Sequence, residues 1–268
     1  MKKIIKNLDL RVIADSGQCF RFYEIEDNVF DVYTGDRLLR IYKISNNEFD
    51  FKCNKNEFKF YENYFDLKTD YNKYSRICDK KDIFLKRCIE YSKGLRILNQ
   101  DKFEMIISFI ISQRKSIKAI RTSIERLAKL CGKKCESEFG KYYAFPTAEQ
   151  IVKVGANKLA SCGLGYRLEY ILDFCKDYLM GKYDLEAFDK LNNEELLNAL
   201  MEIKGVGLKV ASCVALFAYH RIDICPKDVW INRVIDKKYA GKFPDRYKKY
   251  AGIIQQYWFN YSHLEKDL

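Results

Sequence analysis

Lys209 and Asp228 are the two residues whose types and spacing could do covalent chemistry in this chain. Lys209 begins an apolar segment, two residues after the second glycine of "KGVGLKVASC". An ammonium group in the first turn of a helix meets the positive end of the helix dipole, and partial burial between apolar helices would further favour the neutral amine. A neutral amine is a nucleophile that can attack a sugar carbon and form a Schiff base. The alternative is that Lys209 stays charged and contacts a phosphate.

Asp228 follows Pro226 in "CPKDVWINRV", nineteen residues after Lys209. A carboxylate there can cap the helix that begins at "VWINRV", which is the commoner role of such an aspartate. If that helix packs beside the helix of Lys209, the same carboxylate could stabilise oxocarbenium-like charge on a sugar whose glycosidic bond is breaking. Both roles stay open from the sequence.

Two glycines, Gly205 and Gly207, precede the lysine and predict a tight turn between a helix over 193–203 and a helix over 208–219. Such a turn leaves N–H groups free at a helix N-terminus, where they can bind phosphate without reading base sequence. A helix corner with no ligand is the alternative that the glycines alone favour.

The elements around this hairpin divide the chain into two regions. From about residue 8 to 76, aromatic and β-branched residues alternate with polar ones, as in "FDVYTGDRLLRIYKI", which favours strands. From about residue 82 the apolar spacing becomes helical, with N-caps at Thr147 and at Asn192 or Asn193. We expect an α+β protein: an N-terminal antiparallel sheet domain over 1–80 and an all-helical region over 81–268.

Composition limits the partners and cofactors. Lys and Arg number 48 against 37 Asp and Glu, giving a net charge of +11 that is spread along the chain, and this favours polyanions. No segment is long enough to cross a bilayer and no signal peptide opens the chain, so we expect a cytoplasmic protein with no membrane partner. The ten scattered cysteines favour reduced thiols over disulfides, and their spacing argues against both a zinc site and an iron–sulfur cluster.

Taken together, "LMEIKGVGLKVASC" and "CPKDVWINRV" resemble the helix-hairpin-helix plus Gly/Pro-Asp motif of a DNA glycosylase superfamily. Within it the chain looks like an 8-oxoguanine DNA glycosylase. "SGQCFRF" (16–22), "GLGYRLEYI" (163–171) and "YAGIIQQYWF" (250–259) have counterparts in that family, in the same order. The resemblance therefore extends across nearly the whole chain.

The resemblance implies a role for each matching residue. Lys209 would be the Schiff-base nucleophile, Asp228 would assist the sugar chemistry, and the carbonyl of Gly17 would accept the N7–H that distinguishes 8-oxoguanine from guanine. The flipped base would lie between Cys213 and Phe259, with Gln255 at its Watson–Crick edge. Gln256 is an equal candidate for that edge on composition alone. Tyr166 would be the wedge inserted into the base stack and Arg167 the reader of the orphaned base.

The segment "SQRKSIKAI" (112–120) departs from the family, which commonly has an asparagine-rich stretch there. Arg114 and Lys115 occupy that stretch, and Ala119 stands where an arginine can occur. Arg114 could contact either the opposite strand or a phosphate, so preference for an opposite cytosine is in doubt.

The resemblance also implies the cofactors and partners. The backbone carbonyls of Met201, Ile203 and Val206 could hold an optional monovalent cation, and no other cofactor is required. The expected partner is duplex DNA containing 8-oxoguanine, bound by a monomer that is nucleoid-associated if the source is prokaryotic. Two alternatives remain: a glycosylase for another damaged base, and a noncatalytic helix-hairpin-helix DNA-binding protein.

Overall fold

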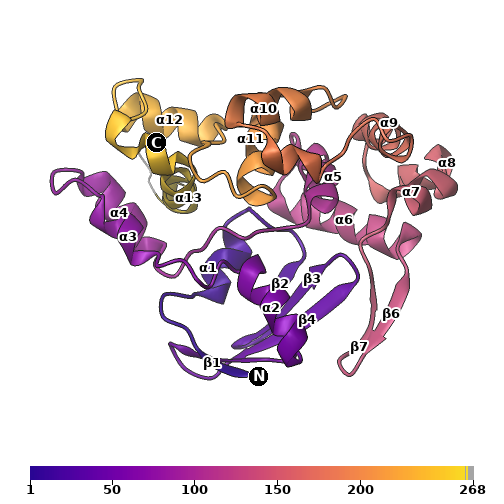
Figure 1. The fold of residues 1–268 in the computed structure, drawn as a ribbon, viewed down its shortest axis with the longest axis horizontal. Coiled ribbons are helices and arrows are strands. Elements are labelled where there is room, and N and C mark those ends of the chain that lie inside the picture. The colour runs from indigo at the N-terminus through magenta and orange to yellow at the C-terminus, as the bar shows by residue number, and fades with distance from the viewer. Residues whose placement is uncertain (263, 265–268) are drawn as a thin grey trace.

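The computed structural model describes residues 1–262 and residue 264, and it confirms the α+β class. An antiparallel five-stranded sheet has the order β1-β5-β4-β3-β2, and the helices lie mostly to one side of it (Figure 1). The strands are β1 (Lys2–Ile4), β2 (Phe22–Glu26), β3 (Val29–Thr34), β4 (Arg37–Lys43) and β5 (Glu48–Phe51).

Alternating side chains hold the sheet in register. Phe30 pairs with Ile41 and Val32 pairs with Leu39 across β3 and β4, and all four side chains are buried. Side chains two residues apart on a strand share one face, so these pairs form one apolar layer against the core. The predicted alternation of apolar and polar residues is therefore correct for this segment.

The prediction of strands throughout residues 8–76 is wrong at three places, which form α1 (Leu10–Asp15), α2 (Lys55–Tyr64) and α3 (Asn72–Arg76). Asn54 and Glu57 make a capping box that starts α2, and Asp9 caps α1 by accepting two backbone N–H groups. These capping signals outweigh the aromatic residues, whose strand preference depends on context.

The C-terminal region is mostly helical. Its helices are α4 (Ile83–Tyr91), α5 (Lys102–Ser112), α6 (Ile117–Cys131), α7 (Ala148–Val154), α8 (Ala156–Leu159), α9 (Arg167–Leu179), α10 (Asn193–Met201), α11 (Leu208–Phe217), α12 (Val229–Lys238) and α13 (Ala251–Ser262). The predicted caps Thr147 and Asn192 are confirmed, each within a capping box. Both helices of the predicted hairpin are confirmed too, each ending two residues earlier than expected.

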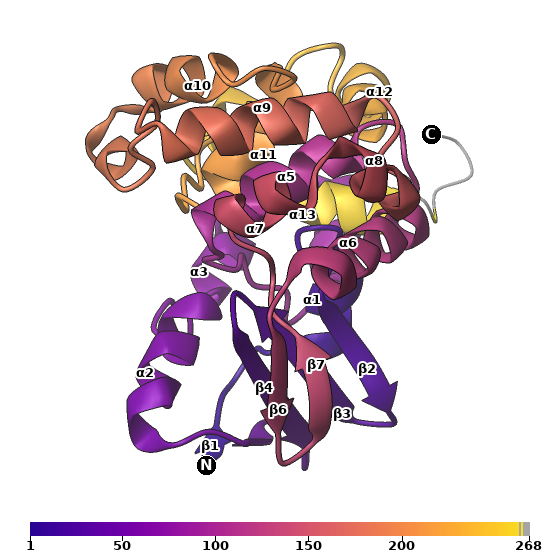
Figure 2. The ribbon, with the colours of Figure 1, turned by 90° about the vertical axis from the view of Figure 1, so that its right-hand side faces the viewer.

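A strand pair corrects the prediction that this region is all-helical. β6 (Lys134–Ser137) and β7 (Gly140–Tyr143) form an antiparallel hairpin that extends from the helices toward the sheet (Figure 2). The hydroxyl of Tyr142 donates to the carbonyl of Asp36 at 2.8 Å, and the N–H of Phe145 donates to the carbonyl of Gly35 at 2.8 Å. The side chains of the β6–β7 hairpin are mostly polar and are exposed or half-buried. The sequence therefore shows little of the apolar alternation that is typical of a strand.

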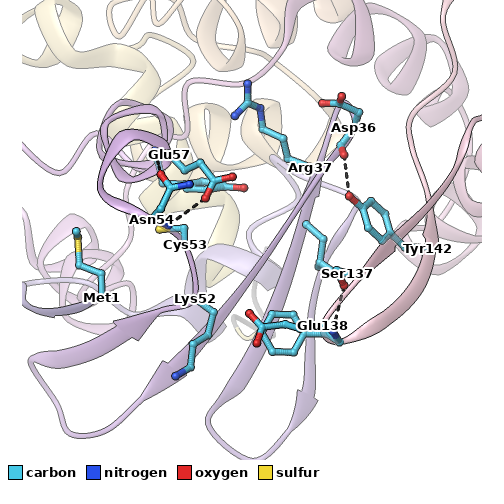
Figure 3. Close-up of a pocket in the computed structure, with 13 residues that line it drawn as sticks. Met1, Asp36, Arg37, Lys52, Cys53, Asn54, Glu57, Ser137, Glu138 and Tyr142 are labelled. Atoms are coloured by element: carbon cyan, nitrogen blue, oxygen red, sulfur yellow. Dashed lines mark hydrogen bonds between the residues drawn. The ribbon is translucent and has the colours of Figure 1, made fainter.

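A cavity of about 790 Å³, here named the sheet groove, lies between this hairpin, α2 and the strand ends (Figure 3). It is lined by Met1, Asp36, Arg37, Leu38, Lys52, Cys53, Asn54, Glu57, Tyr61, Ser137, Glu138, Phe139 and Tyr142. Among the described residues no disulfide links the sheet to the helices, and no helix combines the length and apolar composition of a membrane span.

Candidate active site

A cavity of about 150 Å³, here named the Lys209 pocket, lies where five segments of the chain meet. It is lined by Ser16, Gly17, Phe20, Phe109, Ser112, Lys115, Ile117, Ile120, Lys209, Cys213, Phe217, Pro226, Asp228, Gln255, Gln256 and Phe259. All six residues predicted for catalysis and base binding are in this set. The sequence separates the first of them from the last by more than two hundred residues, and the fold brings them to one cavity.

Lys209 lies in the first turn of α11, as predicted, but its surroundings differ from the expectation. The residue is exposed, so the predicted partial burial is wrong. Its Nζ atom lies 5.7 Å from the centroid of the Phe109 ring, a cation–π distance. The exposed side is the side from which a substrate can approach.

Asp228 is the N-cap of α12, and its Oδ1 accepts the N–H of Ile231 at 2.9 Å. The capping role is therefore confirmed. The residue is half-buried and lines the same cavity as Lys209. Its carboxylate can consequently act on charge that develops inside the pocket while it holds the helix.

Cys213 lies one helical turn after Lys209 and is buried. Burial raises the pKa of its thiol, and the Asp228 carboxylate adds to that effect while the Lys209 ammonium opposes it. A neutral thiol is a small apolar surface, which suits contact with a flat ring better than metal binding or nucleophilic attack.

Gly17 faces Phe259 across the pocket. Gly17 has φ of +73°, and a Cβ there would lie 3.0 Å from Cε1 of the Phe259 ring. Two side-chain amides hold the backbone of this loop: Gln18 donates to the carbonyl of Arg96 at 2.9 Å, and Gln100 donates to the carbonyl of Gln18 at 2.8 Å. Neither glutamine was predicted from the sequence, although "SGQCF" contains the first.

Gln255 and Gln256 both line the pocket, and both are buried. The Nε2 of Gln256 donates to Oε1 of Gln255 at 3.0 Å. Oε1 of Gln256 has no hydrogen-bond partner among the described residues. The geometry therefore presents an amide pair, and the choice between the two glutamines stays open.

A second, more open cavity of about 600 Å³ runs along the helical hairpin, and we name it the hairpin groove. It is lined by Gln113, Arg114, Tyr166, Tyr170, Met201, Ile203, Lys204, Gly205, Val206 and Gly207. Gly205 has φ of +85°, and a Cβ there would lie 2.2 Å from the Tyr170 ring, so only glycine fits. The ring of Tyr166 is half exposed and Arg114 is exposed, which leaves both accessible to a ligand.

Arg167 lies against one of these exposed residues, with its guanidinium carbon 4.4 Å from the centroid of the Tyr166 ring. It is buried, and its guanidinium donates to the carbonyl oxygens of Leu164 and Gln113. To read a base, as the resemblance implies, Arg167 would have to leave both carbonyls. That role stays a prediction.

Met201 is the last residue of α10, and Ile203 and Val206 follow in the turn after it, where the predicted cation would bind. The Ile203 carbonyl already accepts the N–H of Val206 at 2.9 Å and keeps a second lone pair. Neutral carbonyl oxygens on one turn suit a monovalent cation in their donor chemistry, and the site stays a prediction.

Comparison with known proteins gives the family of the chain. Residues 2–106 match the model of the 8-oxoguanine DNA glycosylase N-terminal domain, and residues 107–258 match the HhH-GPD superfamily of base excision DNA repair proteins. MBOgg1, solved with a low-affinity DNA ligand, is 33% identical with a TM-score of 0.91, covering 97% of this chain and 93% of that one. The 8-oxoguanine glycosylase/lyase of Clostridium acetobutylicum, solved with double-stranded DNA containing cytosine opposite 8-oxoguanine, is 30% identical with a TM-score of 0.87, covering 98% of each chain.

A relative from Methanothermobacter thermautotrophicus, a probable N-glycosylase/DNA lyase, is 29% identical over 228 residues, which is 74% of this chain and 72% of that protein. The two family models together cover residues 2–258, which include every residue that lines the Lys209 pocket except Phe259. The chain therefore belongs to the HhH-GPD superfamily of base excision DNA repair proteins, and within it to the 8-oxoguanine DNA glycosylases.

Proposed function

We propose that this protein excises 8-oxoguanine from duplex DNA and then cleaves the abasic site by β-elimination. The observation that carries this proposal is the Lys209 pocket, where a primary amine and a carboxylate share a cavity with aromatic and amide side chains. Relatives over most of the chain are 8-oxoguanine glycosylase/lyases. A base must leave the stack to reach such a pocket.

The chemistry begins with the neutral amine of Lys209 attacking C1′ of the flipped nucleotide. A bond forms between Nζ and C1′, the glycosidic bond breaks, and the base leaves with the bonding electrons and takes up a proton. Asp228 stabilises the positive charge that develops on the sugar. Ring opening then gives an imine, and loss of a C2′ proton expels the 3′ phosphate. These steps use side chains of this chain, so we assign no cofactor to them.

Recognition of the lesion would rest on Gly17. Its carbonyl can accept the N7–H of 8-oxoguanine, whereas guanine presents an acceptor at N7 and would leave a buried carbonyl unsatisfied. Cys213 and Phe259 would hold the two faces of the base. The Gln255 and Gln256 amides offer a donor and an acceptor for its Watson–Crick edge.

The DNA outside the pocket would contact the hairpin groove. Backbone N–H groups near Gly205 and Gly207 suit a phosphate, and the exposed ring of Tyr166 can fill the gap left by the flipped base. Arg114 can contact the opposite strand or a phosphate. Excision by an Arg114 variant from duplexes with each of the four opposite bases would distinguish these two contacts. We expect the protein to act as a monomer.

Borohydride trapping on 8-oxoguanine duplex tests the nucleophile. The wild-type protein should form a covalent adduct and Lys209→Ala should form none. Lys182→Ala is the matched control, because Lys182 is an exposed lysine that lines neither the Lys209 pocket nor the hairpin groove and pairs with Asp177 at 2.7 Å. Equal trapping by Lys209→Ala and wild type would show that another amine reacts.

A lesion panel tests the substrate. Duplexes with 8-oxoguanine, an alkylated purine or an oxidised pyrimidine, each against all four opposite bases, should show release of 8-oxoguanine as the fastest reaction. Faster release of another base would indicate a glycosylase of different specificity. Salt-sensitive binding without release of any base would indicate a noncatalytic DNA-binding protein.

A further inference from the structure

We infer that Gln113 is a positioning residue that couples the Tyr166 loop to the hairpin carrying Lys209. Gln113 lies in the turn over 113–116, between α5 and α6. This inference rests on the proposed function, because it concerns how the same pocket is held for reaction. It starts from the hydrogen bonds that this short turn makes to two separate parts of the protein, and from the position of the turn beside the Lys209 pocket.

The first contact is to the hairpin. Nε2 of Gln113 donates to the carbonyl of Gly205 at 3.0 Å, and also to the carbonyl of Ile110 at 3.2 Å at the end of its own helix. The Tyr170 ring also packs closely against Gly205, since a Cβ there would lie 2.2 Å from that ring. Lys209 follows four residues later, so the direction of the Gly205 peptide sets how α11 begins.

The second contact is to the loop over 163–166, which carries Tyr166. The guanidinium of Arg167 donates to the backbone carbonyl of Gln113, and Nζ of Lys115 donates to the carbonyl of Gly163 at 2.6 Å. Burial lowers the pKa of Lys115, with Arg167 and Arg126 adding to the effect. The loop is therefore tied at both ends to the turn that contains Gln113.

The turn also borders the pocket itself. Ser112, just before the turn, and Lys115, within it, line the Lys209 pocket. When Tyr166 inserts into DNA, a displacement of its loop is thus passed to Gln113, whose side chain donates to the carbonyl of Gly205. Misplacement of a reacting group by about 1 Å can cost about 100-fold in rate.

The chemistry of this position calls for a neutral donor of glutamine's length. A glutamate would place an acceptor against the Gly205 carbonyl, and the two acceptors would oppose each other. An alanine would leave the carbonyl without this donor. A histidine can place its Nε2–H near the position of the glutamine amide nitrogen, so it tests whether the donor is what matters.

The experiment compares Gln113→Glu, Gln113→Ala and Gln113→His in single-turnover assays, with excision from 8-oxoguanine duplex and borohydride trapping on a preformed abasic duplex. We expect the Glu and Ala variants to lose about 10- to 100-fold in both rates, while the His variant stays within about fivefold of wild type. Gln150→Glu is the control, because Oε1 of Gln150 only accepts, from Thr147, and glutamate can do the same.

A double-mutant cycle with Tyr166→Ala tests the coupling. If Gln113 transmits the position of the Tyr166 loop, Tyr166→Ala should cost several-fold less in the Gln113→Ala background than in wild type. Additive effects, or a Glu variant as active as wild type, would overturn the inference. A His variant as impaired as Ala would also overturn it, since the donor would then not be the cause.

These readouts separate this inference from the proposed function. If wild type releases no 8-oxoguanine, the proposed substrate is wrong, and trapping on the abasic duplex still reports on Gln113. If wild type is active and the Gln113 variants match it, the proposed function stands and the coupling does not.

Discussion

The Lys209 pocket and the sheet groove differ in size and in chemistry, and the larger of the two is not the cavity in which we propose the reaction. The sheet groove has about 790 Å³ and the Lys209 pocket about 150 Å³. In the groove, several polar side chains pair with each other or with backbone: Asn54 and Glu57 cap each other's N–H groups at 2.9 and 3.0 Å, and Tyr142 donates to Asp36. The pocket instead has an exposed amine and a buried amide oxygen, Oε1 of Gln256, without a partner among the described residues.

The difference teaches that polar groups without a partner in the protein indicate a reaction site better than cavity volume does. Polar groups that bond each other hold a fold together, as the groove residues hold the β6–β7 hairpin against the sheet. Polar groups that lie close together but do not hydrogen-bond each other can be stabilised by hydrogen bonds to a ligand. Substitutions in the two cavities should therefore separate activity from stability.

The largest effect after loss of the nucleophile is expected for Asp228→Asn. Asparagine caps helices about as well as aspartate, so α12 should stay intact while the negative charge is lost. We expect the single-turnover excision rate to fall by about 100-fold with the melting temperature almost unchanged. Asp9→Asn, at the N-cap of α1, is the matched control. An Asp228→Asn protein that reacts normally would leave Asp228 only its capping role.

A smaller effect is expected for Gly17→Ala, which adds a methyl group 3.0 Å from the Phe259 ring. The methyl would push the ring into the space for the base, so excision of 8-oxoguanine should fall about tenfold or more. Gly181→Ala controls for backbone strain, because Gly181 has φ of +75° with nothing within 4 Å of a Cβ. Equal losses in both variants would assign the effect to strain instead of pocket shape.

The pocket residues could be predicted from the sequence because their signals are local motifs. The hairpin glycines, the lysine after them and the aspartate after a proline are each read within a few residues, and the resemblance supplied Gly17 and the residues of α13. Phe109 and Phe217 were missed because an aromatic residue on a helix gives no sign of facing a cavity rather than the core. Their helices meet only through tertiary packing.

Burial and long-range hydrogen bonds were the features that the sequence could not give. Lys209 was expected to be partly buried and is exposed, because its helix begins at the surface directly after Gly207. The hydrogen bond from Arg167 to the carbonyl of Gln113, fifty-four positions away, was not foreseen, and the role of Arg167 in reading a base stays a prediction. The β6–β7 hairpin was missed because its pairing with the turn at Gly35 stabilises strands that have little alternation of their own.

Glu104 connects the two regions, since α5 extends from the turn at Gly35 to the pocket residues Phe109 and Ser112. The N–H of Gly35 donates to Oε2 of Glu104 at 3.0 Å, and burial raises the pKa of this carboxyl to about 7. A carboxyl with a raised pKa in the folded state lowers stability as pH rises from the unfolded pKa of about 4.5 to 7, because the folded state then has to give up a proton at a cost.

The loss from Glu104 ionisation is on the order of 3 kcal/mol above pH 7. In the Glu104→Gln variant the side chain is neutral at every pH and can still accept from Gly35. We therefore expect the difference in melting temperature between Glu104→Gln and wild type to increase in favour of the variant from about pH 5 to about pH 8. Glu136→Gln, on the exposed face of β6, should follow the wild-type pH dependence. A constant difference across this range would show that Glu104 does not titrate there.

The smallest effect is expected in the sheet groove itself. Lys52 and Glu138 are both exposed there, and Lys52 forms a surface ion pair with Asp50 at 2.8 Å. Surface pairs contribute little to stability because water screens them, so Lys52→Ala combined with Glu138→Ala should shift the melting temperature only slightly. Excision and trapping rates should stay within about twofold of wild type, because neither side chain lies near the Lys209 pocket. A large loss of activity with an unchanged melting temperature would mean that the groove takes part in the reaction, and the distinction between satisfied and unsatisfied cavities would then fail for this fold.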